Sequence, residues 1–150
     1  MNLNKKTRDC TSIVIFIVFS LFILPGVQQS VFANHGKEIA LKLSDSQFIL
    51  LPGKNVSQVK LTTIYSVSDP ATVGKQISGT MKLYTPNGTL LKTTSIPNGF
   101  KVDKSGFQQF VTSLPNSTKS INTIVLFTDL NKTAPLSNSI TSKLVLNKTQ

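Results

Sequence analysis

The chain has 150 residues, a formal net charge of +10, one histidine, one cysteine and no tryptophan. This length is that of a single domain. So few histidine and cysteine residues exclude zinc and copper sites, which need several such ligands. Beyond residue 33 every basic residue is lysine and the lysines are scattered. This argues against a nucleic acid partner and leaves an anionic envelope polymer or lipid surface as the alternative.

The first 33 residues have the composition of a signal peptide. Basic residues at positions 5, 6 and 8 precede an apolar run over residues 13–24, which Pro25 and Gly26 end. Val31 and Ala33 match the preference of signal peptidase, so we expect cleavage after Ala33 and a mature chain of residues 34–150. The mature chain has no cysteine and must rely on a hydrophobic core. The predicted location is secreted or cell surface.

A retained membrane anchor is the alternative to cleavage. Residues 11–27 form a stretch of 17 residues, which is the lower limit for spanning a bilayer. Membrane contact is therefore expected only through the leader, if it is uncleaved, and the preceding basic residues place the domain outside in either case. Cys10 precedes the apolar run instead of following it, so lipid attachment at the cleavage site is not expected.

Beyond the leader, apolar and polar side chains alternate with the period of a β-strand. This alternation is present in residues 38–43 and 59–67, which we expect to be half-buried strands. Residues 52–55 and 69–75 are rich in Gly, Pro, Asn, Ser and Thr and are predicted to be loops.

A hairpin is the strongest local prediction. The strand-like runs 77–85 and 89–95 are separated by Pro-Asn-Gly at residues 86–88. Asn and Gly tolerate the positive φ angles that a tight hairpin turn requires. A second Pro-Asn-Gly at residues 97–99 predicts another turn, followed by a short run over residues 100–102.

The last third of the chain adds three strand-like runs. Residues 107–112 form the first of them. Both faces of the run 121–130 are apolar, which is typical of a strand central to its sheet. Residues 140–147 alternate and predict a closing strand with one solvated side. Loops are predicted over residues 115–120 and 131–139.

The number and spacing of these runs predict an all-β fold. About seven to nine short strands, with a turn signal every 8 to 12 residues or so, are typical of an Ig-like antiparallel β-sandwich with Greek-key connections. A small β-barrel is the alternative. Neither an amphipathic helix nor a linker is evident beyond the leader, so we expect residues 34–150 to form one domain.

The turns and strands between residues 77 and 130 resemble a known type of domain. They include the strand that ends at Tyr84, both Pro-Asn-Gly turns, the Gly-Phe-Gln-Gln-Phe run from residue 106 and the Phe-Thr-Asp-Leu run from residue 127. This segment is similar to small exported Ig-like or fibronectin-III-like domains, in particular those of uncharacterised secreted proteins of archaea. The chain lacks the cysteine pair and core tryptophan of Ig domains, so the resemblance implies a sandwich and no particular subfamily.

Sequons for N-glycosylation, Asn-X-Ser/Thr, occur five times beyond the leader. Their asparagines are Asn55, Asn87, Asn116, Asn131 and Asn147. Four of the five lie in predicted turns, where a modifying enzyme can reach them. The alternative is that turns and polar strands are rich in Asn, Ser and Thr for conformational reasons. We treat the five asparagines as candidate glycosylation sites.

Residue types for catalysis and metal binding are sparse. His35 is the single histidine and lies near the predicted N-terminus, and the five acidic residues beyond the leader are spread one per loop or strand end. No catalytic triad, carboxylate pair or clustered calcium site is predicted. The metal alternatives are weak calcium binding between loops and loose copper chelation by the new N-terminal amine, Asn34 and His35. Asp69, Asp103 and Asp129 are expected to form turns. The chain is predicted to be no enzyme and to need no cofactor.

Aromatic residues give two expectations about surfaces. Tyr65 and Tyr84 fall in alternating strands and are expected in the core. Phe100, Phe107 and Phe110 surround one turn region and form either an apolar patch or part of the core.

The predicted function is that of an exported, non-enzymatic Ig-like module in a cell-envelope, adhesion or protein-interaction role. Recognition would use the loops at residues 69–75 and 131–139 or an exposed edge strand, and the partner would be a protein or an envelope glycan. A polysaccharide-binding or small-ligand module is the alternative. That alternative predicts exposed aromatic residues or a concave sheet, whereas an interaction protein predicts a flat apolar patch or a free strand edge.

Overall fold

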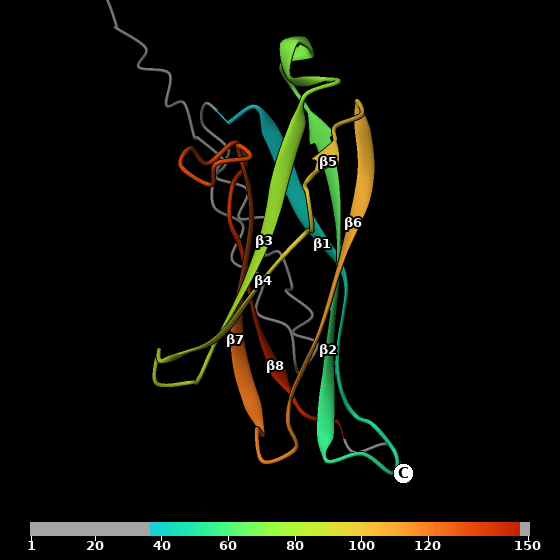
Figure 1. Ribbon diagram of the computed structural model, residues 1–150, viewed down its shortest axis with the longest axis vertical. Helices are drawn as coiled ribbons and strands as arrows, with labels where there is room; N and C mark the ends of the chain where they lie inside the picture. Colours follow the sequence, from blue (N-terminus) through green and yellow to red (C-terminus); the bar gives the residue numbers. More distant parts are fainter. Residues whose placement is uncertain (1–36, 148–150) are drawn as a thin grey trace, which may run out of the picture.

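The computed structural model describes residues 37–147, which form a β-sandwich (Figure 1). Two antiparallel sheets contain eight strands in this part of the chain, in agreement with the predicted all-β class and strand number. The predicted signal peptide, residues 1–33, lies outside the described residues. Between residues 37 and 147 no helix is long and apolar enough to cross a membrane.

The smaller sheet has three long strands in the order β1-β2-β6. They are β1 (Ile39–Leu50), β2 (Val56–Val67) and β6 (Ser105–Pro115). The central strand β2 buries Val59, Leu61, Thr63 and Tyr65, whereas the even-numbered residues between them are half-buried or exposed. A register shift after Leu43 marks a β-bulge in β1.

The larger sheet has the order β4-β3-β7-β8, and the short β5 pairs with the start of β3. Its strands are β3 (Gln76–Tyr84), β4 (Leu90–Ser95), β5 (Phe100–Lys101), β7 (Ser120–Thr128) and β8 (Ile140–Val145). β3 and β4 form the predicted hairpin, in which Gly88 has a φ of 87°. β7 lies between β3 and β8, which confirms the prediction that the run 121–130 is a central strand.

The core lies between the sheets and takes apolar side chains from both. The rings of Tyr65, Phe100 and Phe127 contact one another with centroids 5.0 to 5.9 Å apart, in tilted and edge-to-face arrangements. Gly106 lets β6 approach this cluster, because a Cβ at that position would lie 2.7 Å from the Tyr65 hydroxyl oxygen. Since the two sheets are separate ladders, the fold is the predicted sandwich and not the alternative barrel.

Three strands are longer than their apolar patterns predict. β1 continues to Leu50, β2 begins at Val56 and β6 covers Ser105–Pro115. In β2 and β6 the buried polar residues Ser57 and Thr112 interrupt the apolar alternation while the backbone ladder continues past them. In β1 the bulge after Leu43 shifts the alternation.

Candidate interaction surface

The outer face of the smaller sheet carries three exposed apolar side chains near one edge. Phe107 and Val111 of β6 are 68% and 44% exposed, and Ile64 of β2 is 45% exposed. Ile64 lies directly opposite Phe107 in the β2–β6 register, so the two side chains are neighbours on the same face. We call Ile64, Phe107 and Val111 the β6 strip. Their exposure leaves apolar area in contact with water that a partner can cover.

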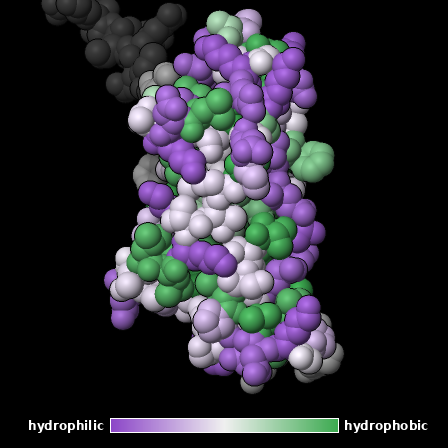
Figure 2. Space-filling model, viewed as in Figure 1, coloured by the Kyte–Doolittle hydropathy of each residue, from purple (hydrophilic) through white to green (hydrophobic). Residues whose placement is uncertain are grey.

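Hydrophobic residues are also exposed elsewhere on the face drawn in Figure 2. Hydrophilic residues gather at both ends of the molecule, and hydrophobic residues form several separate patches between them. Single exposed apolar side chains of this kind are ordinary in soluble domains. Leu90 and Leu91 of β4 and Val145 of β8 are also exposed on outer strands, but those strands are short and carry lysine, whereas the β6 strip borders a longer strand without charge.

β6 is an edge strand of 11 residues that pairs with β2 and, among the described strands, with no other (Figure 1). Its sequence, SGFQQFVTSLP, contains no charged residue. One contact covers the outer side of its backbone, where the Lys92 Nζ of β4 donates to the carbonyl oxygen of Ser113 at 3.2 Å. The edge before Ser113 therefore presents an uncharged row of backbone donors and acceptors.

The two sides of the β6 backbone can be assigned to particular residues. The carbonyl of Gln108 accepts from the Thr63 hydroxyl of β2 at 3.3 Å, whereas the carbonyl of Ser113 points toward β4. The direction of the backbone amide and carbonyl alternates from one residue of a strand to the next. Even-numbered residues of β6 therefore point these groups toward β2, and odd-numbered residues point them toward the free edge. Phe107, Gln109 and Val111 thus combine outward side chains with free-edge backbone groups.

The opposite edge of the same sheet, β1, is covered. The Ile39 amide donates to the Leu136 carbonyl at 3.0 Å. The Asn138 side chain accepts from the Leu41 amide at 2.7 Å and donates to the Leu41 carbonyl at 3.1 Å. Farther along, the Asn147 amide donates to the Phe48 carbonyl at 2.9 Å. Segments that flank β8 therefore bond to outer backbone groups near both ends of β1.

The larger sheet has edges of another kind. β4 and β8 are six residues each, and they carry Lys92 and Lys143 respectively. Short length and lysine are common protections of an edge strand against pairing. Among the four edges in residues 37–147, β6 combines the greatest free length with the absence of charge.

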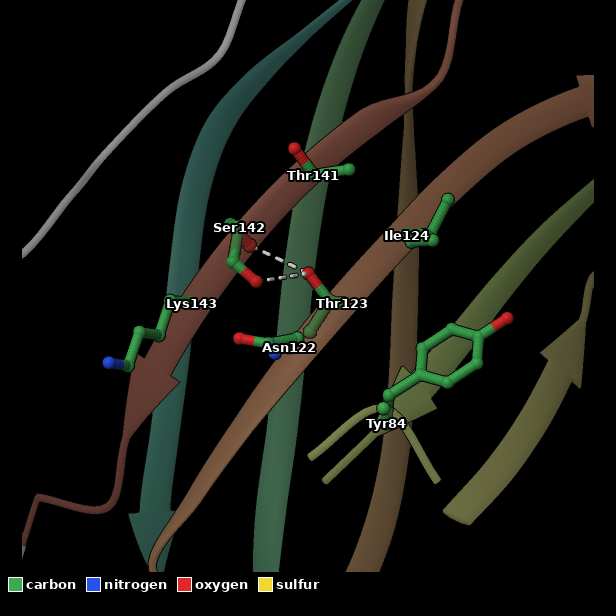
Figure 3. A pocket seen from close by; sticks show the side chains of 8 residues that line it. Tyr84, Asn122, Thr123, Ile124, Thr141, Ser142 and Lys143 are labelled. Atoms are coloured by element: carbon green, nitrogen blue, oxygen red, sulfur yellow. Dashed lines mark hydrogen bonds between the residues drawn. The ribbon is translucent and has the colours of Figure 1, made fainter. Parts of the chain in front are cut away.

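A shallow hollow of about 660 Å³ lies on the outer face of the larger sheet (Figure 3). Tyr84, Asn122, Ile124 and Lys143 are among its lining residues. Tyr84 is half-buried there, so the expectation that it packs in the core is wrong. Strand alternation explains this result, since the buried Leu83 points inward and its neighbour must point outward. The hollow offers an aromatic ring, an amide and a cation to a polar ligand.

The three phenylalanines around residues 100–110 do not form one patch. Phe110 is buried in the core and Phe100 packs against Tyr65 and Phe127. Phe107 alone of the three is exposed, because it has the opposite parity to Phe110 along β6. Tyr65, by contrast, lies in the core as expected, and its hydroxyl accepts from the Asp103 amide at 3.3 Å.

All five sequon asparagines are exposed. Asn55, Asn87 and Asn116 lie in turns, Asn131 lies in the β7–β8 loop and Asn147 follows β8. The β1–β2 and β6–β7 turns lie at the same end of the sandwich (Figure 1). There the Asn116 amide donates to the Asn55 side-chain oxygen at 3.5 Å. Their modification stays a prediction.

The carboxylates of two loops act as turn formers. The Asp69 side chain accepts from the Ala71 amide at 2.9 Å and begins a 3-10 turn (Pro70–Thr72). Asp129 accepts from the Thr133 and Ala134 amides at 2.7 and 2.8 Å and from the Thr133 hydroxyl at 2.7 Å. These donors, the Ala134 amide foremost, hold the pKa of Asp129 below its ordinary value. Within residues 37–147, no three His, Cys, Asp or Glu side chains are grouped as metal ligands.

Comparisons with known proteins support the fold. No family model and no curated protein sequence matches the chain. Its structure is similar to part of the β-glucuronidase of Parabacteroides merdae, with a TM-score of 0.53 and 8% identity over 75% of this chain and 14% of that one. It is also similar to the C-terminal domain of wzt, with a TM-score of 0.51 and 13% identity over 85% of this chain and 81% of that one.

A CARDB domain from Pyrococcus furiosus aligns with a TM-score of 0.34 and 12% identity, over 81% of this chain and all of that one. The chain spans about one seventh of the β-glucuronidase it matches. At these identities the likenesses concern the fold: residues 37–147 form an Ig-like β-sandwich.

Proposed function

We propose that this protein is an exported, non-enzymatic Ig-like module of the cell surface that binds a partner along β6. The observation that supports the proposal most directly is the β6 strip beside an uncharged, unpaired strand edge. Such an edge can accept an extended segment as an additional strand, while exposed side chains beside it contribute apolar contact. The leader supports export, and the five exposed sequons suit a glycoprotein of the envelope.

A photo-crosslinking experiment tests this function. In a Cys10→Ser background, an introduced cysteine is the single thiol whether or not the leader is removed. Phe107→Cys is labelled with a benzophenone maleimide and compared with Val145→Cys, which lies on the outer face of the larger sheet and is similarly exposed, at 61%. The labelled proteins are illuminated with cell envelopes of the host.

The expected result is covalent adducts from position 107 and few or none from position 145. Adducts from position 145 in excess of those from position 107 would place binding on the larger sheet and overturn the proposal. Unlabelled protein added in excess should suppress specific adducts, which separates them from random contacts.

The hollow on the larger sheet favours a second candidate function, polysaccharide or small-ligand binding. Tyr84 offers a ring for stacking on a sugar, and Asn122 and Lys143 offer polar contacts beside it. Binding of envelope polysaccharide, followed by the NMR signals of β7 and β8, should weaken in Tyr84→Ala and persist in Phe107→Lys. The reverse pattern would exclude this site.

A further inference from the structure

We propose that the partner of β6 includes a second copy of this chain, paired with it as an antiparallel strand around a two-fold axis at Gln109. The pairing would join two smaller sheets into one sheet of six strands. This inference rests on the proposed function, because it assigns an occupant to the same strand edge.

Backbone geometry permits the pairing without any change in the β2–β6 ladder. The free edge presents the amides and carbonyls of odd-numbered residues, and Gln109 lies midway between the exposed Phe107 and Val111 in the stretch before Ser113. In antiparallel pairing, residues that exchange two hydrogen bonds alternate with residues that exchange none. With the axis at Gln109, the two copies of Gln109 lie opposite each other and exchange two hydrogen bonds. Phe107 of each copy forms a hydrogen-bonded pair with Val111 of the other.

The side chains are self-complementary in the same register. Phe107 of each copy lies beside Val111 of the other on the outer face, and aromatic residues opposite β-branched residues are favourable cross-strand pairs. The neutral Gln109 side chains meet at the axis. This pairing thus buries exposed apolar surface of both Phe107 and Val111. Because of the two-fold symmetry, each contact occurs twice.

Charge selects β6 over the other edges for this association. A net charge of +10 opposes self-association in general. Two copies of β6 nevertheless bring no charged residue into the paired stretch, whereas pairing through β4 or β8 brings together copies of Lys92 or Lys143. Lys92 at Ser113 limits the hydrogen-bonded stretch to residues 107–111. The remaining repulsion between whole molecules predicts that added salt strengthens the dimer.

Disulfide mapping tests the register. In the Cys10→Ser background, Gln109→Cys should form a disulfide-linked dimer, because hydrogen-bonded antiparallel partners have Cα atoms about 5.5 Å apart, within the range of a disulfide. Phe107→Cys should not link to itself, because its two copies lie about 14 Å apart along the strands. A mixture of Phe107→Cys and Val111→Cys should form the mixed dimer.

Linkage of Phe107→Cys to itself as fast as Gln109→Cys would show random collision and overturn the register. The two positions are a matched pair, since both side chains project from the outer face of β6.

Sedimentation measurements test the association itself. The wild-type protein should show a concentration-dependent monomer–dimer equilibrium whose Kd decreases with added NaCl. Phe107→Lys should raise the Kd about tenfold or more, because it sets a lysine on the edge. Val145→Lys is the matched control: it adds the same charge at a similarly exposed apolar residue on the outer face of the larger sheet, away from β6, and should change the Kd much less.

The outcomes separate this inference from the proposed function. If the wild-type protein stays monomeric at all concentrations while the label at position 107 crosslinks to another envelope component, self-pairing is overturned and the proposed function stands. A label at position 107 that reaches neither a second copy nor an envelope component overturns both.

Discussion

The two outer strands of the smaller sheet, β1 and β6, meet their surroundings in different ways. Outer backbone groups of β1 are bonded by Leu136, Asn138 and Asn147, three residues that flank β8. β6 has the Lys92 contact near its end and a free, uncharged stretch before it. Both strands are long, yet within residues 37–147 the segments that flank β8 bond to outer backbone groups of β1, whereas the outer groups of β6 before Ser113 have no such bonds.

A proline pair provides the largest expected effect. Gln108→Pro removes an amide that bonds to β2 and should lower the free energy of unfolding by about 3 kcal/mol. Gln109→Pro removes an amide of the free edge, where proline is tolerated, and should lower the free energy of unfolding by about 1 kcal/mol or less. Urea unfolding measures both. Equal losses for the two variants would contradict the assignment of β6 backbone groups, and with it the free edge.

The covered edge should respond to loss of its cap. Asn138→Ala leaves the Leu41 amide and carbonyl without the two bonds they receive from one side chain, so we expect destabilisation of about 2 kcal/mol. Asn131 is exposed and lies in the same β7–β8 connection, so the free energy of unfolding of Asn131→Ala should stay within about 0.5 kcal/mol of the wild-type value. Hydrogen exchange of the Leu41 amide should accelerate in Asn138→Ala alone.

Between the two edges, Ser57 of β2 tests the packing of the strand that both share. Ser57 is fully buried, pairs with Leu50 of β1 and Leu114 of β6, and its hydroxyl has no hydrogen-bond partner. Ser57→Ala should therefore raise the free energy of unfolding by up to about 1 kcal/mol. Ser142→Ala should have the opposite sign, because the Ser142 hydroxyl bonds to Thr123 at 2.6 Å. Thermal unfolding of both variants checks the contrast.

Local features of this fold were predictable from the sequence, whereas the contrast between the edges was not. The Pro-Asn-Gly hairpin and the central strand β7 follow from turn residues and from apolar residues on both faces. The cap on β1 joins Leu41 to Asn138 across 97 positions, and no local pattern marks that contact. The alternation of β6 places Phe107 outward, but edge position depends on strand order, which is a property of the whole sandwich.

The smallest expected effect is a pH dependence of the covered edge. Asp129 holds the loop that leads to the β1 cap, and its pKa is lowered by the bonds from Ala134 and Thr133. Because this pKa is lower in the folded protein than in the unfolded chain, the carboxylate stabilises the fold in full above its ordinary pKa. The contribution is lost as the pH falls through the folded-state pKa.

The difference in Tm between the wild type and Asp129→Asn should therefore shrink as the medium becomes acidic, and the protection factor of the Leu41 amide against hydrogen exchange should decrease in the wild type over the same range. Asp45→Asn is the matched control, since the Asp45 carboxylate accepts from the exposed Gln47 side chain and from no loop amide described in residues 37–147. A Tm difference that is constant with pH would show that the Asp129 turn does not support the cap. Acid would then not weaken the hydrogen bonds at the β1 edge in particular. The two edges would differ only in whether their outer backbone groups are bonded.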